Sequence, residues 1–170
     1  MRGVMDAAAR AVDLTRTFLT DLEPESRIHD VQNDPRFQHR GVDLLWDRPG
    51  LPVLGVEVKG DRNARRGNFF FELLSNAEKE SPGCFLYSEA DWLTYVFLET
   101  QTVYALPLDE TRAWFRQHAA QYPLKHTQTR TGPVRYTTVG AVVPVKHVLT
   151  HVKTVLTWAP GRSAPGRAAS

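Results

Sequence analysis

Asp43, Glu57 and Lys59 combine two carboxylates and an amine within a short stretch of the chain. Asp43 lies in the apolar run 41–46, and the other two lie in the run 53–59. Two carboxylates that leave the other coordination positions of a metal ion to water suit Mg²⁺ or Mn²⁺. A neighbouring amine can position an attacking water or neutralise developing phosphate charge. These residue types together predict metal-assisted phosphodiester hydrolysis.

The two runs are expected to pair as an antiparallel hairpin centred on Gly50. Both alternate as strands do, and the Pro-Gly turn signal in residues 47–52 separates them. One face of the hairpin then pairs only apolar residues: Val42 with Val58, Leu44 with Val56 and Trp46 with Leu54. The opposite face places Asp43 across from Glu57, with Lys59 two residues further on the same side. Directly opposed Cβ atoms lie roughly 4.5–5.5 Å apart.

Such clustering of like charges destabilises a sheet unless something compensates for it. We expect either a raised pKa for one carboxylate or a cation between the two. The competing interpretation is a solvated Glu57–Lys59 pair on an exposed face, because Glu-x-Lys is a common tripeptide. The hairpin register adds Asp43 to the pair and therefore favours a catalytic site.

The pattern Asp43, then Glu57-Val58-Lys59, resembles the PD-(D/E)xK nuclease superfamily. Its members include restriction endonucleases, archaeal Holliday-junction resolvases and the nuclease domains of recombination enzymes. The resemblance covers mainly residues 6–80, and the strings 34–43 and 67–72 also look like uncharacterised bacterial and phage members. Val42 stands where the motif has proline, a departure that many members share.

The resemblance implies a restriction-endonuclease-like core and an endonuclease acting on DNA. Asp43, Glu57 and the main-chain carbonyl of Val58 would bind the metal, Mg²⁺ with Mn²⁺ able to substitute. Lys59 would assist the nucleophilic water. The DNA could be branched or single-stranded.

The order of predicted elements indicates an α/β protein with a mixed central sheet flanked by helices. Helices are expected at 6–22, 68–76 and from 109 to 117, with a helix or strand-helix element at 145–158. Strands are expected at 27–31, in the hairpin, and at 83–87, 93–98, 102–106 and 135–139, with 93–98 pairing with 102–106. The buried stripe expected on the first helix comprises Ala8, Ala11, Val12, Phe18, Leu19 and Leu22.

Length and composition agree with a single domain over residues 1–158. Residues 159–170 lack an apolar pattern and are predicted to form a disordered Pro/Gly/Ala/Arg tail. The net charge is only +2, so basic residues would have to act locally. Cys84 is the single cysteine, which excludes an internal disulfide and fits a buried strand residue in a reduced compartment. With no apolar run long enough for a membrane span and no signal layout, we expect a cytoplasmic protein without a membrane partner.

An acid on the first helix often supplies another metal ligand in this superfamily. Asp13 stands at a plausible distance before Asp43, but it lies opposite the apolar stripe. Asp6 has the same problem, and Asp21 sits nearer the edge of the stripe. Solvated helix acids are the alternative interpretation for all three.

Three further residues are candidates for a supporting role. A helix beginning at Asn68, a good N-cap, would place Asn68 and Glu72 on one face that borders the site. Glu72 fits a surface acid equally well. Gln38 precedes the strand of Asp43 and could contact a phosphate or a water, although an ordinary exposed glutamine explains it too.

Arginines follow Lys59 in a glycine-bounded loop: Arg62, Arg65 and Arg66. Beside a two-carboxylate site they would suit contact with a phosphate backbone. A looser basic stretch is expected to form a loop that either reaches a groove or is simply solvated: Lys125, His126, Arg130 and Arg135.

Two patterns are interpreted as structural. His147 and His151 have the spacing of zinc ligands, but the sequence offers no clear third ligand. The aromatic run 69–71 could stack bases, yet at least two of its rings should be buried on a helix beside a core.

Two alternatives to a DNA endonuclease remain open. The hairpin could be the scaffold of a catalytically inactive domain that binds nucleic acid or a partner. An RNA-directed nuclease on the same fold is the other. A chain of this length has little room for a specificity domain, so sequence-specific recognition would call for a homodimer or a partner subunit.

Overall fold

The computed structural model describes residues 2–161 and 166–167. The α-helices of this part are α1 (Arg2–Leu22), α2 (Pro35–Gln38), α3 (Cys84–Tyr87), α4 (Leu108–His118) and α5 (Val145–His151). The strands are β1 (Arg27–Asp30), β2 (Leu44–Asp47), β3 (Leu54–Asp61), β4 (Asn68–Asn76), β5 (Ser81–Pro82), β6 (Trp92–Phe97), β7 (Thr102–Pro107), β8 (Leu124–Thr131), β9 (Val134–Pro144), β10 (Leu156–Trp158) and β11 (Gly166–Arg167). Short 3₁₀ turns occupy η1 (Ala64–Arg66), η2 (Ala77–Lys79) and η3 (Ala119–Gln121).

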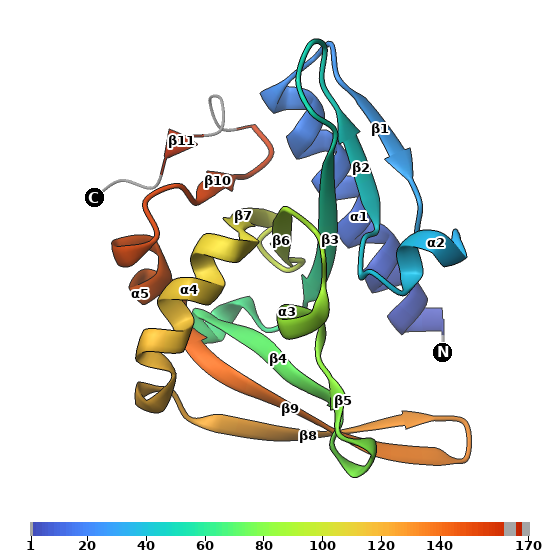
Figure 1. Ribbon diagram of the computed structural model, residues 1–170, viewed down its shortest axis with the longest axis vertical. Coiled ribbons are helices and arrows are strands. Elements are labelled where there is room, and N and C mark those ends of the chain that lie inside the picture. The colour runs from blue at the N-terminus through green and yellow to red at the C-terminus, as the bar shows by residue number, and fades with distance from the viewer. Residues whose placement is uncertain (1, 162–165, 168–170) are drawn as a thin grey trace.

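The strands form two sheets (Figure 1). The first sheet has the order β1-β2-β3-β6-β7-β10-β11, and the second has the order β5-β4-β9-β8. Within the first sheet β3 and β6 run parallel, while the other neighbours are antiparallel. The second sheet is antiparallel. This mixed α/β architecture confirms the expected fold class.

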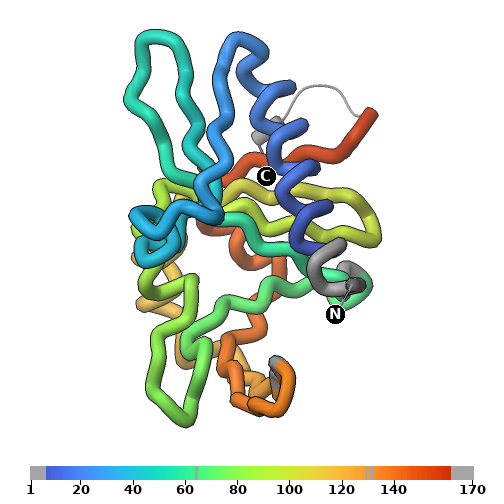
Figure 2. Tube along the Cα trace, turned by 90° about the vertical axis from the view of Figure 1, so that its right-hand side faces the viewer, coloured from blue at the N-terminus to red at the C-terminus, as the bar shows by residue number. Residues whose placement is uncertain are grey.

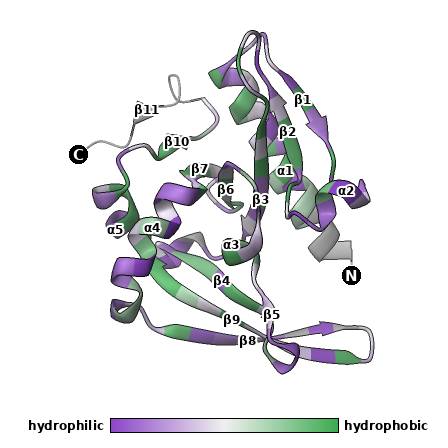
Figure 3. Cartoon of the chain, in the orientation of Figure 1, coloured by the Kyte–Doolittle hydropathy of each residue, from purple (hydrophilic) through white to green (hydrophobic). Residues whose placement is uncertain are grey.

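The first sheet is covered on both faces. Helix α1 packs on one face, where Ala11, Phe18 and Leu19 meet Val56 and apolar residues of β2, β6 and β7. The opposite face meets the second sheet and helices α3, α4 and α5 in a second cluster rich in aromatic rings. Figures 1 and 2 both show α1 alongside the β1–β3 strands, with the β8–β9 hairpin at the other end of the molecule. Hydrophobic residues dominate β4 in Figure 3.

The central hairpin forms in the predicted register. Leu44 pairs with Val56 and Trp46 with Leu54, and the turn between the strands contains Gly50 at a φ of 72°. The ladder ends at Leu44, so the expected pairing of Val42 with Val58 is wrong: Val42 is buried in the cluster on the other face of the sheet. The pairing of β6 with β7 is also as predicted.

The first helix is confirmed, and four residues of the expected stripe are buried, Ala11, Val12, Phe18 and Leu19, whereas Leu22 is only half-buried. Ala8 is exposed, whereas Thr15 is fully buried. The Thr15 hydroxyl lies 3.1 Å from the hydroxyl of Thr94 on β6. This hydrogen bond satisfies two polar groups that would otherwise be costly to bury.

The helix predicted for residues 68–76 is wrong, because this segment is strand β4. Its residues alternate, with Phe69 and Phe71 fully buried and Phe70 and Glu72 only half-buried. β4 pairs with β9 along most of its length, and this distant partner supplies the hydrogen bonds that decide the conformation. Asn68 is therefore the first residue of a strand and caps no helix.

The strand predicted for residues 83–87 is also wrong, since Cys84–Tyr87 is the single helical turn α3. Arg112 on α4 is nearly buried and donates hydrogen bonds to the carbonyls of Phe85 and Ser88, at 2.7 Å each. These bonds satisfy carbonyls at the end of the turn. Cys84 is thus a partly buried helical residue.

The remaining expectations are resolved as follows. The element predicted for 145–158 is a helix followed by a strand, α5 and β10, and the predicted strand 135–139 is part of the longer β9. The prediction of a loop for the basic stretch from Lys125 to Arg135 is wrong, because its basic residues lie on the paired strands β8 and β9. Of the predicted tail, residues 162–165 and 168–170 lie outside the described residues, and Gly166–Arg167 forms β11. None of the helices that the structure describes has the length and apolarity that a membrane crossing requires.

Candidate active site

Asp43 and Glu57 are brought together where β2 approaches β3. The backbone N–H of Asp43 donates to the carbonyl of Val56 at 2.9 Å, and Val56 is also the ladder partner of Leu44, where the pairing ends. The Asp43 carboxylate then accepts a hydrogen bond from the N–H of Val58 at 2.8 Å through Oδ2. This second bond fixes the Asp43 side chain beside the strand that carries Glu57 and Lys59.

Both carboxyl groups are hard to ionise in this position. Burial, together with the neighbouring charge of Asp43, raises the pKa of Glu57 to about 8 against the opposing effect of Lys59. Burial also raises the pKa of Asp43, although the hydrogen bond from Val58 works in the other direction. Two carboxyl groups that both resist ionisation form a site whose charged state needs a compensating cation.

Lys59 is held by an ion pair that joins the two sheets. Its Nζ lies 3.0 Å from Oε2 of Glu72 on β4, and both side chains are mostly buried. Burial by itself would lower the pKa of Lys59, but the pKa is raised overall, because the carboxylate of Glu72 attracts the ammonium charge and accepts its hydrogen bond. Lys59 is therefore a protonated hydrogen-bond donor, a state that does not suit a general base.

Glu72 belongs to the site, as predicted, but it comes from a strand. Its position is fixed by a close contact between Gly83 and the β4 backbone: a Cβ at Gly83 would lie 2.4 Å from the carbonyl oxygen of Glu72. The N–H of Gly83 also donates to the carbonyl of Leu73 at 2.8 Å. Glycine at the start of α3 thus lets the chain press against β4 where Glu72 reaches Lys59.

A buried polar contact supports strand β3 from the side of α1. The hydroxyl of Thr94 lies 3.2 Å from the carbonyl oxygen of Glu57, to which it donates, and Thr15 on α1 lies 3.1 Å from the same hydroxyl. Thr94 is paired with Val58 in the parallel ladder of β3 and β6. These contacts tie the backbone that carries Glu57 to two other elements.

The donor set suits a hard divalent cation. The N–H and C=O groups of one residue in a β-strand point toward the same edge of the strand. Because the N–H of Val58 points toward Asp43, the carbonyl of Val58 also lies on the Asp43 side of β3. Two carboxylate side chains and one carbonyl oxygen match the oxygen ligands of Mg²⁺, which keeps several waters. Among the described residues no group of three His, Cys, Asp or Glu side chains is arranged to hold a metal, so such a site would depend on the carbonyl and on water.

Cys84 and Tyr87 of α3 also border the cluster, and the sequence did not single them out as part of it. Burial raises the pKa of Cys84 to about 12, so this thiol is neutral. Burial also raises the pKa of Tyr87, and Glu57 adds to the effect. The signal was hidden because residues 83–87 resemble a strand, whereas the helical turn is imposed by the contacts of Gly83 and Arg112.

Other predicted residues lie apart from this cluster. Asp13 is exposed on α1 and lines a separate hollow with Arg16 and Asp30. Asp21 accepts a hydrogen bond from the Trp158 indole at 2.9 Å, and the side chain of Asp6 lies outside the described residues. Gln38 is exposed at the end of α2, and the described contacts do not include it in the cluster.

The predicted arginines line a groove next to the site. Arg62, Arg65 and Arg66 are exposed around a hollow of about 690 Å³, to which Arg10 of α1 contributes a fourth cation. Arg65 is paired with Glu99 at 2.8 Å. Asn63 and Arg66 also line a second hollow of about 220 Å³, which includes Lys59 and Asn68. The basic loop therefore borders both the wider groove and the smaller hollow that includes Lys59.

The chain matches no protein-family model, no curated protein and no solved structure.

Proposed function

We propose that this protein is a metal-dependent endonuclease that hydrolyses phosphodiester bonds in DNA. The observation that carries the proposal is the meeting of Asp43, just before β2, with Glu57 and Lys59 on β3, and the pKa of Glu57 raised to about 8. Strongly perturbed acids beside a charged partner are typical of catalytic sites. The mixed sheet, with α1 on one face, supports the restriction-endonuclease-like core that the sequence resembles.

Asp43, Glu57 and the carbonyl of Val58 would hold Mg²⁺, for which Mn²⁺ could substitute. When bound, the ion lowers the pKa of a water and stabilises the extra negative charge of the transition state. Glu57 would release its proton on binding, so affinity for the ion should rise with pH up to about 8. The hydrogen bond from Val58 would keep the Asp43 carboxylate oriented.

Lys59 would act as a fixed cation. Its ammonium group can donate hydrogen bonds to the attacked phosphate or to the water, while Glu72 holds it in place at 3.0 Å. Because its pKa is raised, the proton taken from the water has to go elsewhere, to a phosphate oxygen or to solvent. In this mechanism Lys59 therefore positions the water or the phosphate and neutralises negative charge on the phosphate.

The basic groove supplies the grip on the substrate. Arg10, Arg62 and Arg66 are exposed along the hollow that leads to Lys59, and they suit a phosphate backbone. We place this activity in the cytoplasm, where Cys84 would remain a free thiol. A homodimer or a partner subunit would be required only for sequence-specific cutting.

The test is a cleavage assay on supercoiled plasmid, single-stranded and branched oligonucleotides, and RNA, with Mg²⁺, Mn²⁺ or EDTA. We expect cutting of DNA that needs the metal and disappears in Asp43→Asn, Glu57→Gln and Lys59→Ala. Asp43→Asn keeps an oxygen that can accept from Val58, and Lys59→Ala should still bind metal by calorimetry. Glu89→Gln, an exposed carboxylate paired with Arg40, is the matched control. Binding of DNA without cutting or metal uptake would favour an inactive binding domain, and preferential cutting of RNA would favour the RNA-directed enzyme.

A further inference from the structure

The second sheet has one buried face and one face that is only partly buried. Phe69, Phe71 and Ala141 of β4 and β9 point into the core and are fully buried. The alternate residues Phe70 and Glu72 pair with Val142 and Gly140 on the other face. Since Glu72 holds Lys59, this face begins beside the catalytic cluster, and strands β9 and β8 extend it across the sheet (Figure 1).

A hollow of about 220 Å³ lies at this junction. Three cations line it, Lys59 from β3, Arg66 from the basic loop and Lys125 from β8. Asp61 lines it as well, but its carboxylate already accepts hydrogen bonds from the Tyr95 hydroxyl and the Asn63 N–H, both at 2.6 Å. The hollow therefore presents a net positive surface beside the residues that would cut the chain.

Phe70 gives the hollow an aromatic wall. A Cβ on Gly140 would lie 2.4 Å from Cζ of Phe70 and 2.6 and 2.7 Å from the two Cε atoms. These short distances put the end of the ring flat over the glycine, so one face of the ring rests on β9. The side chain stays half-buried and lines the hollow with its remaining surface.

We propose that this hollow takes one unpaired nucleotide of the substrate, with its base against Phe70 and its flanking phosphates at Arg66 and Lys125. An aromatic platform next to cations is what single-stranded nucleic acid requires, because every base has a π-face. The proposal rests on the proposed function and defines its substrate class. The enzyme acts on single-stranded, frayed or branched DNA and leaves blunt duplex largely uncut.

The dimensions favour this class over duplex. A hollow of about 220 Å³ admits a base and its sugar but no double helix. A base in a duplex is stacked between its neighbours and can reach Phe70 only after it has unpaired and unstacked. That step costs a few kcal/mol, which an unpaired base avoids. Arg66 lines both this hollow and the wider arginine groove, so the strand can continue from one into the other.

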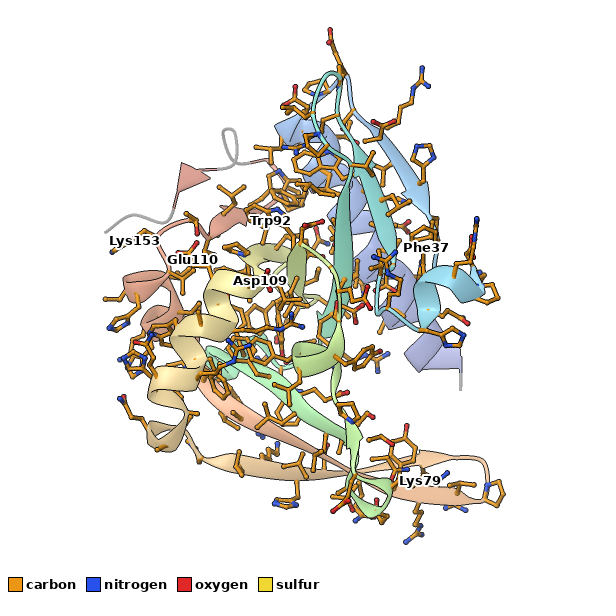
Figure 4. All side chains as sticks on the ribbon, viewed as in Figure 1. Phe37, Lys79, Trp92, Asp109, Glu110 and Lys153 are labelled. Carbon is orange, nitrogen blue, oxygen red and sulfur yellow. The ribbon has the colours of Figure 1, made fainter. Side chains whose placement is uncertain are left out.

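The experiment measures binding separately from cutting. The full chain is titrated in EDTA against a fluorescent 12-nucleotide DNA strand, the same strand as a blunt duplex, and a forked duplex. The variants are Phe70→Leu, which keeps an apolar side chain but removes the π-face, Phe70→Trp, Arg66→Ala and Lys125→Ala. Leu124→Ala, from an exposed side chain on the opposite face of β8, and Lys153→Ala, far from the hairpin in Figure 4, are the controls.

We expect the strand and the fork to bind at least tenfold more tightly than the duplex. Phe70→Leu should weaken binding of the DNA strand by about 5- to 150-fold, the range for loss of one stacked base. Phe70→Trp keeps an aromatic face and should bind the DNA strand about as tightly as the unmodified protein. Arg66→Ala and Lys125→Ala should each reduce the salt slope by about 0.7. Both controls should bind like the unmodified protein.

Equal affinity for strand and duplex, or a Phe70→Leu variant that binds normally, would overturn the proposal even if metal-dependent cutting were found. Phe70-dependent strand binding without any cutting would leave the nucleotide pocket standing and remove the nuclease. Thermal melts of each variant confirm that lost binding is not lost folding.

Discussion

The charged residues beside the first sheet are partly buried: Asp43, Glu57 and Lys59. The charged residues of the second sheet are exposed: Lys125, Arg130 and Arg135. Burial changes what the first group does, since both carboxyl groups hold their protons more tightly than usual. Exposed cations are screened and contribute small, additive amounts to the grip on a polyanion. Under the proposed function, the first region would concentrate charge for cleavage and the second would distribute it for binding.

Glu57→Gln should give the largest separation between the two regions. Cleavage should fall by at least about 10³-fold, because the metal loses a carboxylate while the shape of the site is kept. DNA affinity in EDTA should change by less than about twofold. Single-turnover cleavage and anisotropy titrations measure the two quantities, and a parallel loss of both would mean that the regions are not separate.

Stability should depend on pH through the first region. Glu57 binds its proton with a pKa of about 8 when folded and an ordinary value of 4.5 when unfolded, so the folded chain carries extra protons between these values. The free energy of unfolding of the metal-free protein should fall as pH rises from about 4.5 to about 8, by at most about 1.4 kcal/mol per pH unit for this proton. Urea unfolding in EDTA measures it.

Glu57→Gln is the control, since it removes the titrating proton. Its unfolding free energy should be nearly flat over the same range except for the smaller effect of Asp43. Added Mg²⁺ should restore stability at pH 8 in the unmodified protein. A stability that rises with pH in this window would contradict the burial of Glu57.

Glu72→Gln tests the link between the two regions. Removing the charge leaves Lys59 partly buried and unpaired, which should cost about 1–3 kcal/mol of stability and reduce cleavage about 10- to 100-fold. Denaturant unfolding and cleavage kinetics measure the two effects. Glu99→Gln, an acid paired with Arg65 at the exposed groove, should change both by much less.

Gly140→Ala should have the smallest effect. The added methyl group meets the ring of Phe70 and has to displace it, at a cost of about 1 kcal/mol or somewhat more, because the ring end can move into the hollow. Strand binding should weaken severalfold, while cleavage of saturating substrate stays within about twofold. Unchanged strand affinity would show that the ring is not positioned by the glycine.

The β2–β3 hairpin could be predicted because its parts are local. The turn at 47–52 and the alternation on either side determine which residues of β2 and β3 face each other, and Leu44, Val56, Trp46 and Leu54 pair as expected. Val42 escaped the pattern because the ladder stops at Leu44. Local hydrophobic patterning therefore predicts which residues of β2 and β3 pair, but not where the pairing of the two strands ends.

The second sheet could not be predicted in the same way. β4 finds its partner β9 about seventy residues further along the chain, and the run Phe69-Phe-Phe71 fits a helix or a strand equally well until that partner is known. Residues 83–87 likewise look like a strand, and only the contacts of Gly83 with β4 and of Arg112 with Phe85 make them helical. The sequence predicts Glu72 at the site on a helix, whereas the structure has it there on strand β4.

The contact of Phe70 with Gly140 has an evolutionary consequence. A ring that lies flat on one particular glycine ties two positions seventy residues apart into a single requirement. In descendants of this sequence, an aromatic residue at 70 should be inherited together with glycine at 140. Lineages that lose the ring should be free to gain a side chain there, and such paired substitution would reveal selection on the pocket without a single assay.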